Sequence, residues 1–307
     1  MAGRQQPVPF LKGHGTENDF VIIPDPEGRL ELSPETVARL CDRRAGIGGD
    51  GVLRVVRSAA DPAARAQADG AEWFMDYRNA DGSLAEMCGN GIRVFARYLR
   101  RAGLVEEAEF PVATRAGLRR VRFAEEAPGA TRATDGATPA GNPAGNIAVD
   151  MGPARLPAGP EPSVTVTVGD RSWPARHVDM GNPHAVAFVD RLADAGPLLD
   201  PPGLAPAAAY PAGANVEFAV DRGPRHLALR VHERGSGETR SCGTGACAVA
   251  VAAARRDGAD PAADGRPVTY TVDVPGGRLW VTEAPDGSVT LSGPAVIVAE
   301  GTVLLPE

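Results

Sequence analysis

Alternating apolar and polar residues predict that most of this chain forms β-strands. In a half-buried strand successive side chains point to opposite faces, so alternation over about four to eight residues is typical of a strand. The clearest such segments are 164–168, 215–220, 226–232, 268–274, 278–282 and 289–298, with shorter ones at 20–23, 51–56 and 185–189.

Three segments follow the spacing of an α-helix instead. The segment 33–40 begins with Ser-Pro, a favoured N-cap followed by a favoured first helical residue. A second helix is predicted over about 88–101, where apolar residues recur at helical spacing and Gly103 follows. The third, over about 242–256, is nearly all Ala and Val in its middle. A helix that is apolar all round is buried on every side.

The second and third helices open with matching phrases, which indicates an internal duplication. Residues 88–91 (CGNG) parallel residues 242–245 (CGTG), and the two cysteines lie 154 residues apart, half the chain. Upstream of each cysteine lie a Gly/Ser pair and, before it, a predicted strand. We therefore expect an α+β fold of two pseudo-symmetric domains, each a curled mixed sheet or barrel around a central helix.

Length and composition agree with two domains joined by loops. The chain has 307 residues, and domains average roughly 150 residues. Residues 124–146 are rich in Ala, Gly, Pro and Thr, which predicts a flexible loop or linker between the halves. Residues 196–213 have a similar composition and are predicted to form an exposed loop.

The charge balance excludes two classes of partner. The net charge is −7 at pH 7, so the chain is a poor candidate for nucleic acid or for an anionic membrane surface. The sequence contains no apolar run long enough to span a membrane. Residues 1–9 lack the apolar core of a signal peptide, so we expect a cytoplasmic location. We also expect a small-molecule partner.

The cysteines and the single lysine bear on cofactors. A cytosolic chain of this size is not expected to use structural disulfides, and there is no C-x2-C pair for zinc. Lys12 is the only lysine, and it has no phosphate-binding context, which argues against pyridoxal phosphate. The GIGGDG segment at 46–51 follows a helix and precedes a strand, the reverse of a dinucleotide site. We expect no cofactor and no metal, and a structural role for Cys41 and Cys247.

Cys88 and Cys242 are the strongest candidates for chemistry. A thiol at a helix N-terminus lies beside free N–H groups and the positive end of the helix dipole, which lowers its pKa. Inversion of an α-carbon needs a base on one face and an acid on the other, and two matched thiols can supply both. The free N–H groups of both helices could also hold a carboxylate as it gains negative charge.

Five further residues stand near these motifs, each with a structural alternative. His184 precedes a predicted strand, and Glu233 lies nine residues before Cys242; either could tune a thiol, or form a turn and a surface ion pair. The amides of Asn18, Asn79 and Asn215 suit the ammonium and carboxylate ends of a ligand. Asparagine also forms turns, so the residues alone leave both interpretations open.

Taken together, these phrases resemble those of diaminopimelate epimerases. They occur in the family's order and cover essentially the whole chain. The matching segments are GHGTENDF (13–20), CDRRAGIGGDG (41–51), MDYRNADGSLAEMCGNGIR (75–93), DMGNPHAV (179–186), GANVEF (213–218), VHERGSGETRSCGTGAC (231–247) and VPGG (274–277).

The resemblance implies a reaction and a site. The reaction is the cofactor-independent interconversion of LL- and meso-diaminopimelate, in lysine and peptidoglycan biosynthesis. By resemblance Cys88 donates and Cys242 accepts the proton from LL to meso, while His184 and Glu233 modulate the thiols. The implied substrate contacts are Asn18, Asn79, Gly89, Asn90, Asn182, Asn215, Glu233, Arg234, Gly243 and Thr244.

The resemblance also implies the domain arrangement. The family has two pseudo-symmetric domains with a cleft between them, and it often dimerises. A C-terminal strand near 291–305 is expected to return to the first domain. The expected domains are therefore 1–145 plus 291–307, and 146–290.

One position departs from the family, and three rival functions remain. Many members have Gln where this chain has Gly51, so that substrate contact must be lost, replaced or supplied by water.

A proline or hydroxyproline racemase shares the fold and the thiols but usually has His where this chain has Asn90. A phenazine-type isomerase lacks the cysteine pair. A thiol redox protein would form and reduce a Cys88–Cys242 disulfide as part of its function. We expect instead that such a disulfide would inactivate this protein.

Overall fold

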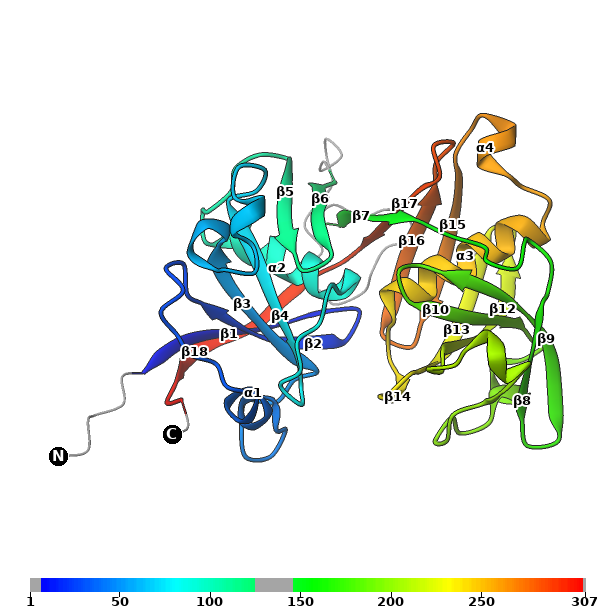
Figure 1. The fold of residues 1–307 in the computed structure, drawn as a ribbon, viewed down its shortest axis with the longest axis horizontal. Helices are drawn as coiled ribbons and strands as arrows, with labels where there is room; N and C mark the ends of the chain where they lie inside the picture. Colours follow the sequence, from blue (N-terminus) through cyan, green and yellow to red (C-terminus); the bar gives the residue numbers. More distant parts are fainter. Residues whose placement is uncertain (1–6, 125–145, 306–307) are drawn as a thin grey trace. The chain divides into compact units, whose positions relative to one another are not determined.

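The computed structural model describes residues 7–124 and 146–305, and Figure 1 shows their fold. Contacts divide the chain into two compact units, residues 1–149 with 294–307, and residues 150–293. The predicted linker 124–146 lies outside the described residues except for its two ends. The expected domains, 1–145 plus 291–307 and 146–290, stay a prediction.

The first unit is a curled mixed sheet wrapped around one buried helix, α2 (Gly89–Arg101). Its strands lie in the order β18-β1-β2-β3-β4-β5-β6-β7, with β2–β3 and β4–β5 parallel and the others antiparallel. Helix α1 (Pro34–Cys41) packs outside, against β2 and β3. The strands are β1 (Val8–Gly15), β2 (Asn18–Pro24), β3 (Gly51–Arg57), β4 (Trp73–Asn79), β5 (Glu109–Thr114), β6 (Gly117–Phe123), β7 (Ile147–Pro153) and β18 (Val296–Val303).

The second unit is built in the same way around α3 (Gly243–Arg256). Its order is β11-β8-β9-β10-β12-β13-β15-β16-β17, with β10–β12 and β13–β15 parallel; β14 also pairs with β13. A short helix, α4 (Pro261–Asp264), follows α3. The strands are β8 (Val164–Val168), β9 (Arg171–Asp179), β10 (Pro183–Phe188), β11 (Gly203–Ala205), β12 (Asn215–Gly223), β13 (His226–Glu233), β14 (Gly237–Thr239), β15 (Val268–Val274), β16 (Gly277–Glu283) and β17 (Ser288–Gly293).

The two units repeat one topology, which confirms the predicted duplication. From β8 onward, each pairing in the second unit has the same sense as the corresponding pairing from β18 onward in the first. In each unit a strand of the sheet, β4 or β13, ends nine residues before the cysteine, and the helix begins directly after the cysteine. The last strand of the chain, β18, completes the first unit by pairing with β1, as expected.

Two predicted segments were wrong in extent or character. The single strand expected over 289–298 is two strands, β17 and β18, and the break falls at Pro294, which has no N–H to donate to a ladder. The stretch 196–213 is not an exposed loop throughout. Leu198 and Tyr210 are buried there, and the Tyr210 hydroxyl donates to the backbone carbonyl of His184.

Strand β4 is fixed by a buried ion network that the sequence did not reveal. The Asp76 carboxylate is fully buried and accepts hydrogen bonds from Arg54, Arg78 and Arg115. Arg54, also buried, bonds Asp25 at 2.8 Å as well. Burial opposes ionisation of Asp76, but the hydrogen bonds from Arg115 and Arg78 outweigh it and hold the pKa of this carboxyl below its usual value.

We expect Asp76→Asn to destabilise the protein by about 3–5 kcal/mol, because it removes the buried carboxylate that pairs with the half-buried Arg78 and Arg115 guanidinium groups. The free energy of unfolding from urea titration measures this. Because the folded-state pKa is lowered, the stabilisation is present above the unfolded pKa of aspartate, about 3.9, and is lost as the pH falls below it. The control is Glu72→Gln, whose exposed ion pair with Arg57 should contribute under about 1 kcal/mol. Equal losses in both variants would refute a structural role for the network.

Candidate functional site

In the first unit Cys88 is the N-cap of α2. Its Sγ accepts a hydrogen bond from the Gly91 N–H at 3.4 Å and donates to Asn18 Oδ1 at 3.6 Å. The thiol is only partly buried. This is the position predicted from the sequence, at the electropositive end of a buried helix.

Three of the predicted ligand residues gather around this thiol. Asn90 Nδ2 donates to Asn18 Oδ1 at 3.1 Å, and Asn18 Nδ2 donates to Asp50 at 2.8 Å. The fully buried Arg93 guanidinium fixes the same turn by donating to Asn90 Oδ1 at 2.9 Å and to the Gly89 carbonyl at 3.0 Å. The sequence-based list omitted Arg93, although an arginine one turn into a buried helix signals such a role.

Asn79 belongs to a different set of contacts. It ends β4, and its side chain donates to Ser83 Oγ at 3.0 Å within the turn that follows. This contact is the one expected of a turn-forming asparagine. Its place in the substrate site stays a prediction.

Gly51 begins β3, opposite Asn79 on β4, and has no room for a side chain. A Cβ built here would lie 2.5 Å from the Arg78 carbonyl oxygen and 2.8 Å from the Tyr77 ring. The neighbouring strand thus occupies the space that a glutamine would need. Glycine at position 51 therefore fits the close packing of β3 against β4.

In the second unit Cys242 is the N-cap of α3. Its Sγ accepts from the Gly245 N–H at 3.3 Å and lies 3.5 Å from Thr244 Oγ1. Unlike Cys88, this cysteine is buried, with 5% of its surface exposed. Gly243 opens the helix directly after it.

The other predicted residues of this unit form two groups. His184 Nε2 lies 3.1 Å from Asn182 Oδ1, and Asn182 Nδ2 donates to Thr244 Oγ1 at 3.4 Å, which links β10 to the first turn of α3. Asn215 accepts from the Arg234 backbone N–H at 2.9 Å, which fixes the turn after β13.

Glu233 supplies a half-buried carboxyl beside Cys242. Burial raises the pKa of Glu233, and hydrogen bonds from Thr239 and Cys242 oppose that rise. The surface ion pair considered from the sequence is not what the structure shows. A carboxyl in contact with a thiol can exchange a proton with it.

The electrostatics of Cys242 differ from the sequence-based expectation. Burial, followed by the charges of Glu233 and Glu217, raises the pKa of Cys242 well above its usual value. The hydrogen bonds from Thr244 and the Gly245 N–H lower the pKa, as expected at a helix N-terminus, but burial dominates. Burial therefore favours the thiol form of Cys242 over the thiolate.

The structure also adds Glu217, which the sequence-based list omitted. Its carboxylate Oε1 lies 2.6 Å from His184 Nδ1, and both side chains are fully buried. A charged residue between Val216 and Phe218 on a strand was the available signal. Alternation places it on the same face as Asn215.

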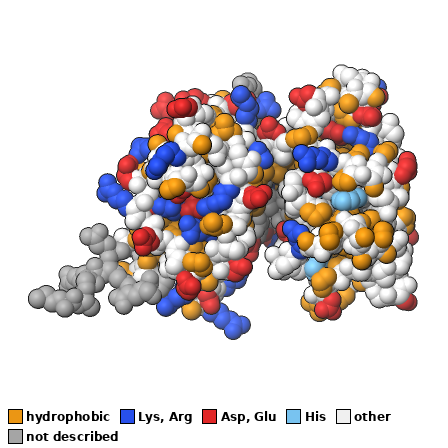
Figure 2. Space-filling model, in the orientation of Figure 1, with side chains coloured by type: hydrophobic (Ala, Val, Ile, Leu, Met, Phe, Trp, Pro, Cys, Tyr) orange, Lys and Arg blue, Asp and Glu red, His pale blue; other side chains and the backbone are white. Residues whose placement is uncertain are grey.

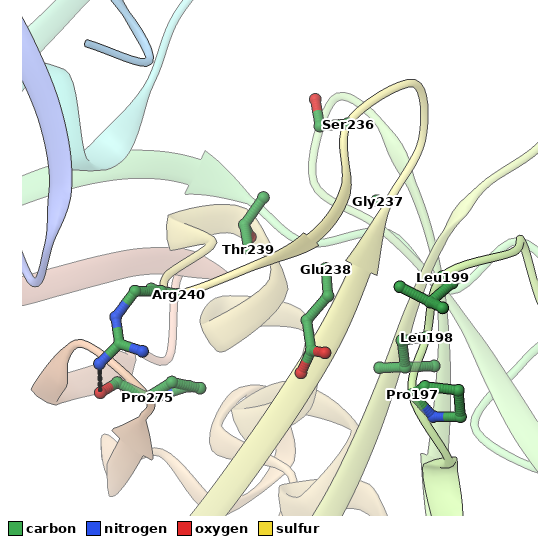
Figure 3. Close-up of a pocket in the computed structure, with 9 residues that line it drawn as sticks. All are labelled: Pro197, Leu198, Leu199, Ser236, Gly237, Glu238, Thr239, Arg240 and Pro275. Carbon is green, nitrogen blue, oxygen red and sulfur yellow. Dashed lines mark hydrogen bonds between the residues drawn. The ribbon is translucent and has the colours of Figure 1, made fainter. Parts of the chain in front are cut away.

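A separate hollow of about 600 Å³ lies on the second unit (Figure 3). Its charged side chains already have protein partners: Arg240 donates to the Pro275 carbonyl at 3.0 Å, and Glu238 pairs with Arg230 at 2.6 Å. Its lining contains none of the predicted site residues, so it carries no argument for the chemistry. The lining residues are Pro197, Leu198, Leu199, Ser236, Gly237, Glu238, Thr239, Arg240 and Pro275.

Surface charge and metal ligands add little to the site. On the face drawn in Figure 2, basic and acidic side chains are interspersed over the unit that carries the N-terminus. Within 7–124 and 146–305, no three His, Cys, Asp or Glu side chains are grouped to hold a metal ion. No helix in those ranges is long and apolar enough to cross a membrane.

Comparison with solved structures defines the class of fold. A phenazine biosynthesis protein of the PhzF family from Bacillus anthracis matches with a TM-score of 0.67 and 18% identity, covering 97% of this chain and 99% of its own. A hydroxyproline epimerase from Agrobacterium vitis matches with a TM-score of 0.64 and 16% identity, covering 100% of this chain and 95% of its own. The expected two-domain α+β fold is thereby confirmed.

Sequence comparison defines the family. The family model described as diaminopimelate epimerase matches residues 10–139 and 176–298. A diaminopimelate epimerase from Streptomyces coelicolor is 66% identical over 96% of this chain and 94% of its own length. Another, from Thermobifida fusca, is 51% identical over 96% and 98%. The chain belongs to the diaminopimelate epimerase family, as its motifs indicated.

We expect Gly51→Gln to lower the free energy of unfolding by about 1–3 kcal/mol, because the new side chain overpacks β3 against β4. Urea or thermal unfolding measures the loss. The control is Gly203→Gln on β11, where a Cβ would meet nothing closer than 3.5 Å. That variant should stay within about 0.5 kcal/mol of the parent protein. Unchanged stability in Gly51→Gln would show that β3 can accept a side chain at this position.

Proposed function

We propose that this chain performs the family reaction, the interconversion of LL- and meso-diaminopimelate, with Cys88 and Cys242 as its two acid/base groups. Membership of the family makes the chain an isomerase that acts on diaminopimelate. The observation that carries the cysteine assignment is that both are N-caps of buried helices in corresponding places of a duplicated fold. No other pair of cysteines within the described residues has this relation.

The proposed chemistry moves one proton in and one proton out. In the LL-to-meso direction the Cys242 thiolate removes the α-proton, and the electron pair left on the α-carbon spreads into the carboxylate. The Cys88 thiol then delivers its proton to the opposite face of that carbon, which inverts it. The result is one substrate proton on Cys242 and a thiolate on Cys88, and the reverse direction restores the original state.

Glu233 is proposed to prepare Cys242 for this step. Because Cys242 donates a hydrogen bond to Glu233, the carboxylate can take the thiol proton and leave a thiolate. The raised pKa of Glu233 makes it a better acceptor than an exposed glutamate. His184, whose charge lowers the pKa of Glu233, adjusts this balance.

The free N–H groups at the start of each helix are proposed to hold the reacting carboxylate as it gains charge. Anions bind at helix N-termini because the unpaired N–H groups and the helix dipole both favour them. The remaining contacts are proposed to orient the far end of the substrate. The substrate residues are Asn18, Asn79, Gly89, Asn90, Asn182, Asn215, Glu233, Arg234, Gly243 and Thr244. A homodimer and a cytoplasmic location stay predictions from the resemblance and the sequence.

The test is α-proton exchange in D2O with purified, reduced protein, LL-diaminopimelate and no added cofactor. We expect the α-proton NMR signal to disappear as the meso form appears. Cys88→Ser and Cys242→Ser should each lower the rate by about 10²–10⁴-fold, since each removes one of the two proton-transfer groups. The control is Cys247→Ala, a buried cysteine within the Ala-rich part of α3, which should keep the parent rate.

Two results would contradict the proposal. Exchange on L-proline or hydroxyproline but not on diaminopimelate would keep the two-thiol chemistry and change the substrate. Full activity in both serine variants would leave the thiols with a redox or structural role. An oxidised protein with full turnover would also refute the view that a Cys88–Cys242 disulfide inactivates the enzyme.

A further inference from the structure

The duplicated fold shows which residues of the two units correspond. In the first unit Phe20 on β2 lies opposite Gly51 on the parallel strand β3. In the second unit His184 on β10 lies opposite Asn215 on the parallel strand β12. His184 therefore takes the place of Phe20. Two residues further along each second strand, Glu217 takes the place of Leu53.

The first turns of the two central helices support this correspondence independently. A Cβ built at Gly91 in α2 would lie 3.3 Å from a Leu53 methyl carbon and 3.5 Å from the Phe20 ring. A Cβ built at Gly245 in α3 would lie 2.8 Å from Glu217 Oε1. Leu53 and Glu217 thus contact the same point of each helix, the glycine whose N–H group bonds the capping cysteine.

The two thiols consequently have different buried neighbours in the same frame. Below the Cys88 turn the space is filled by Leu53 and Phe20, both fully buried and apolar. Below the Cys242 turn the same space holds Glu217 and His184, both fully buried and ionisable. In the first unit the hydrocarbon side chains of Leu53 and Phe20 fill this space. Packing alone therefore does not require an acid and a base at the same place in the second unit.

Glu217 is costly for the fold. Taking a carboxylate out of water is unfavourable unless its oxygens are hydrogen-bonded. Oε1 is paired with His184 Nδ1 at 2.6 Å, but Oε2 is buried with no hydrogen-bond partner. A half-satisfied buried acid at a position where the duplicate uses leucine points to a role in the chemistry rather than in stability.

A continuous series of contacts leads from this acid to the thiol. Glu217 bonds one nitrogen of His184, the other nitrogen lies 3.1 Å from Asn182 Oδ1, and Asn182 Nδ2 donates to Thr244. Thr244 Oγ1 lies 3.5 Å from Cys242 Sγ. Two of these links join separate elements: Glu217 to His184 connects β12 with β10, and Asn182 to Thr244 connects the start of β10 with α3. The series therefore couples the position of Glu217 to the first turn of α3.

We propose that Glu217 is a positioning residue that holds His184, and through it the first turn of α3, for the Cys242 half of the reaction only. The inference rests on the proposed function, because it assigns Glu217 to one of the two thiols named there. The Cys88 half uses no ionisable residue at the corresponding place.

The charges around Cys242 predict how its pKa changes when Glu217 is replaced. Glu233 on β13 and Glu217 on β12 both raise the pKa of Cys242, after burial. His184 on β10 acts on Glu233, and it also interacts with His177 on β9. The charge of Glu217 adds to burial in raising the pKa of Tyr210, whose hydroxyl bonds the His184 carbonyl. Removing the Glu217 charge takes one like charge away from the Cys242 thiolate.

The experiment compares Glu217→Leu, which installs the residue of the first unit, with Glu217→Gln, which keeps the size and a hydrogen-bonding oxygen. Alkylation of the native protein by iodoacetamide is followed against pH, with mass spectrometry reading Cys88 and Cys242 separately and distinguishing Cys242 from Cys247. In both variants the pH midpoint for Cys242 should fall by about one unit, because a nearby carboxylate charge is gone. The midpoint for Cys88 in the same molecules should not move.

Turnover measurements distinguish the positioning role of Glu217 from the effect of its charge. With LL-diaminopimelate, Glu217→Leu should lower kcat by about 10–100-fold, the loss typical when a group that orients a reactive side chain is removed. KM should change little, because Glu217 does not contact substrate in this proposal. Glu217→Gln should recover most of that kcat, because its amide oxygen can still accept from His184 Nδ1.

A matched control guards against general damage. Glu283 is another buried glutamate of the second unit, paired with Arg255. Glu283→Gln should lower stability without moving either alkylation midpoint. An unchanged Cys242 midpoint in both Glu217 variants, or equal shifts at Cys88 and Cys242, would overturn the inference. The proposed function fails by a different result, full turnover in Cys88→Ser and Cys242→Ser.

Discussion

The rest of this structure depends on one helix enclosed by each curled sheet. Residues of α2 and α3 are buried almost throughout, so neither helix can shift or fray without opening a core. The N-terminus of each helix must still satisfy its free N–H groups. In both units a cysteine sulfur accepts one of them, from Gly91 and from Gly245. The packing of the core therefore fixes a thiol at the N-terminus of each helix, which is the arrangement on which the proposed proton transfer depends.

Within that shared frame the two thiols have been made unequal by their neighbours. Cys88 is partly exposed and bonded to the neutral amide of Asn18. Cys242 is buried beside Glu233 and near the His184–Glu217 pair, and its pKa is raised accordingly. In the proposed reaction the two thiols exchange roles as acid and base, and such groups need not have the same resting state. In the second unit buried polar side chains lie near the thiol, and there burial raises the pKa of Cys242.

Gly51 and Asn215 show how the same place in a duplicated fold can serve different ends. Each begins the second strand of its parallel pair, opposite Phe20 and His184 respectively. At Gly51 the neighbouring strand lies so close that a Cβ would clash with the Arg78 carbonyl. At Asn215 there is space for an amide, which accepts from the Arg234 N–H and fixes the turn after β13. At the first position the strand spacing leaves no room for a side chain, and at the second it does.

The sequence by itself determined the frame. The Ser33, Cys88 and Cys242 caps, the duplicated CGxG phrase and the strands with clear alternation are local patterns, and local patterns follow from backbone geometry and side-chain period. The same motifs sufficed to identify the family. Only the tertiary structure decided the break at Pro294, the burial of Tyr210, and the contacts of Arg93 and Glu217. It also decided the sign of the pKa shift at Cys242. Burial and charge around a group depend on residues far apart in the chain, and no spacing along the sequence measures them.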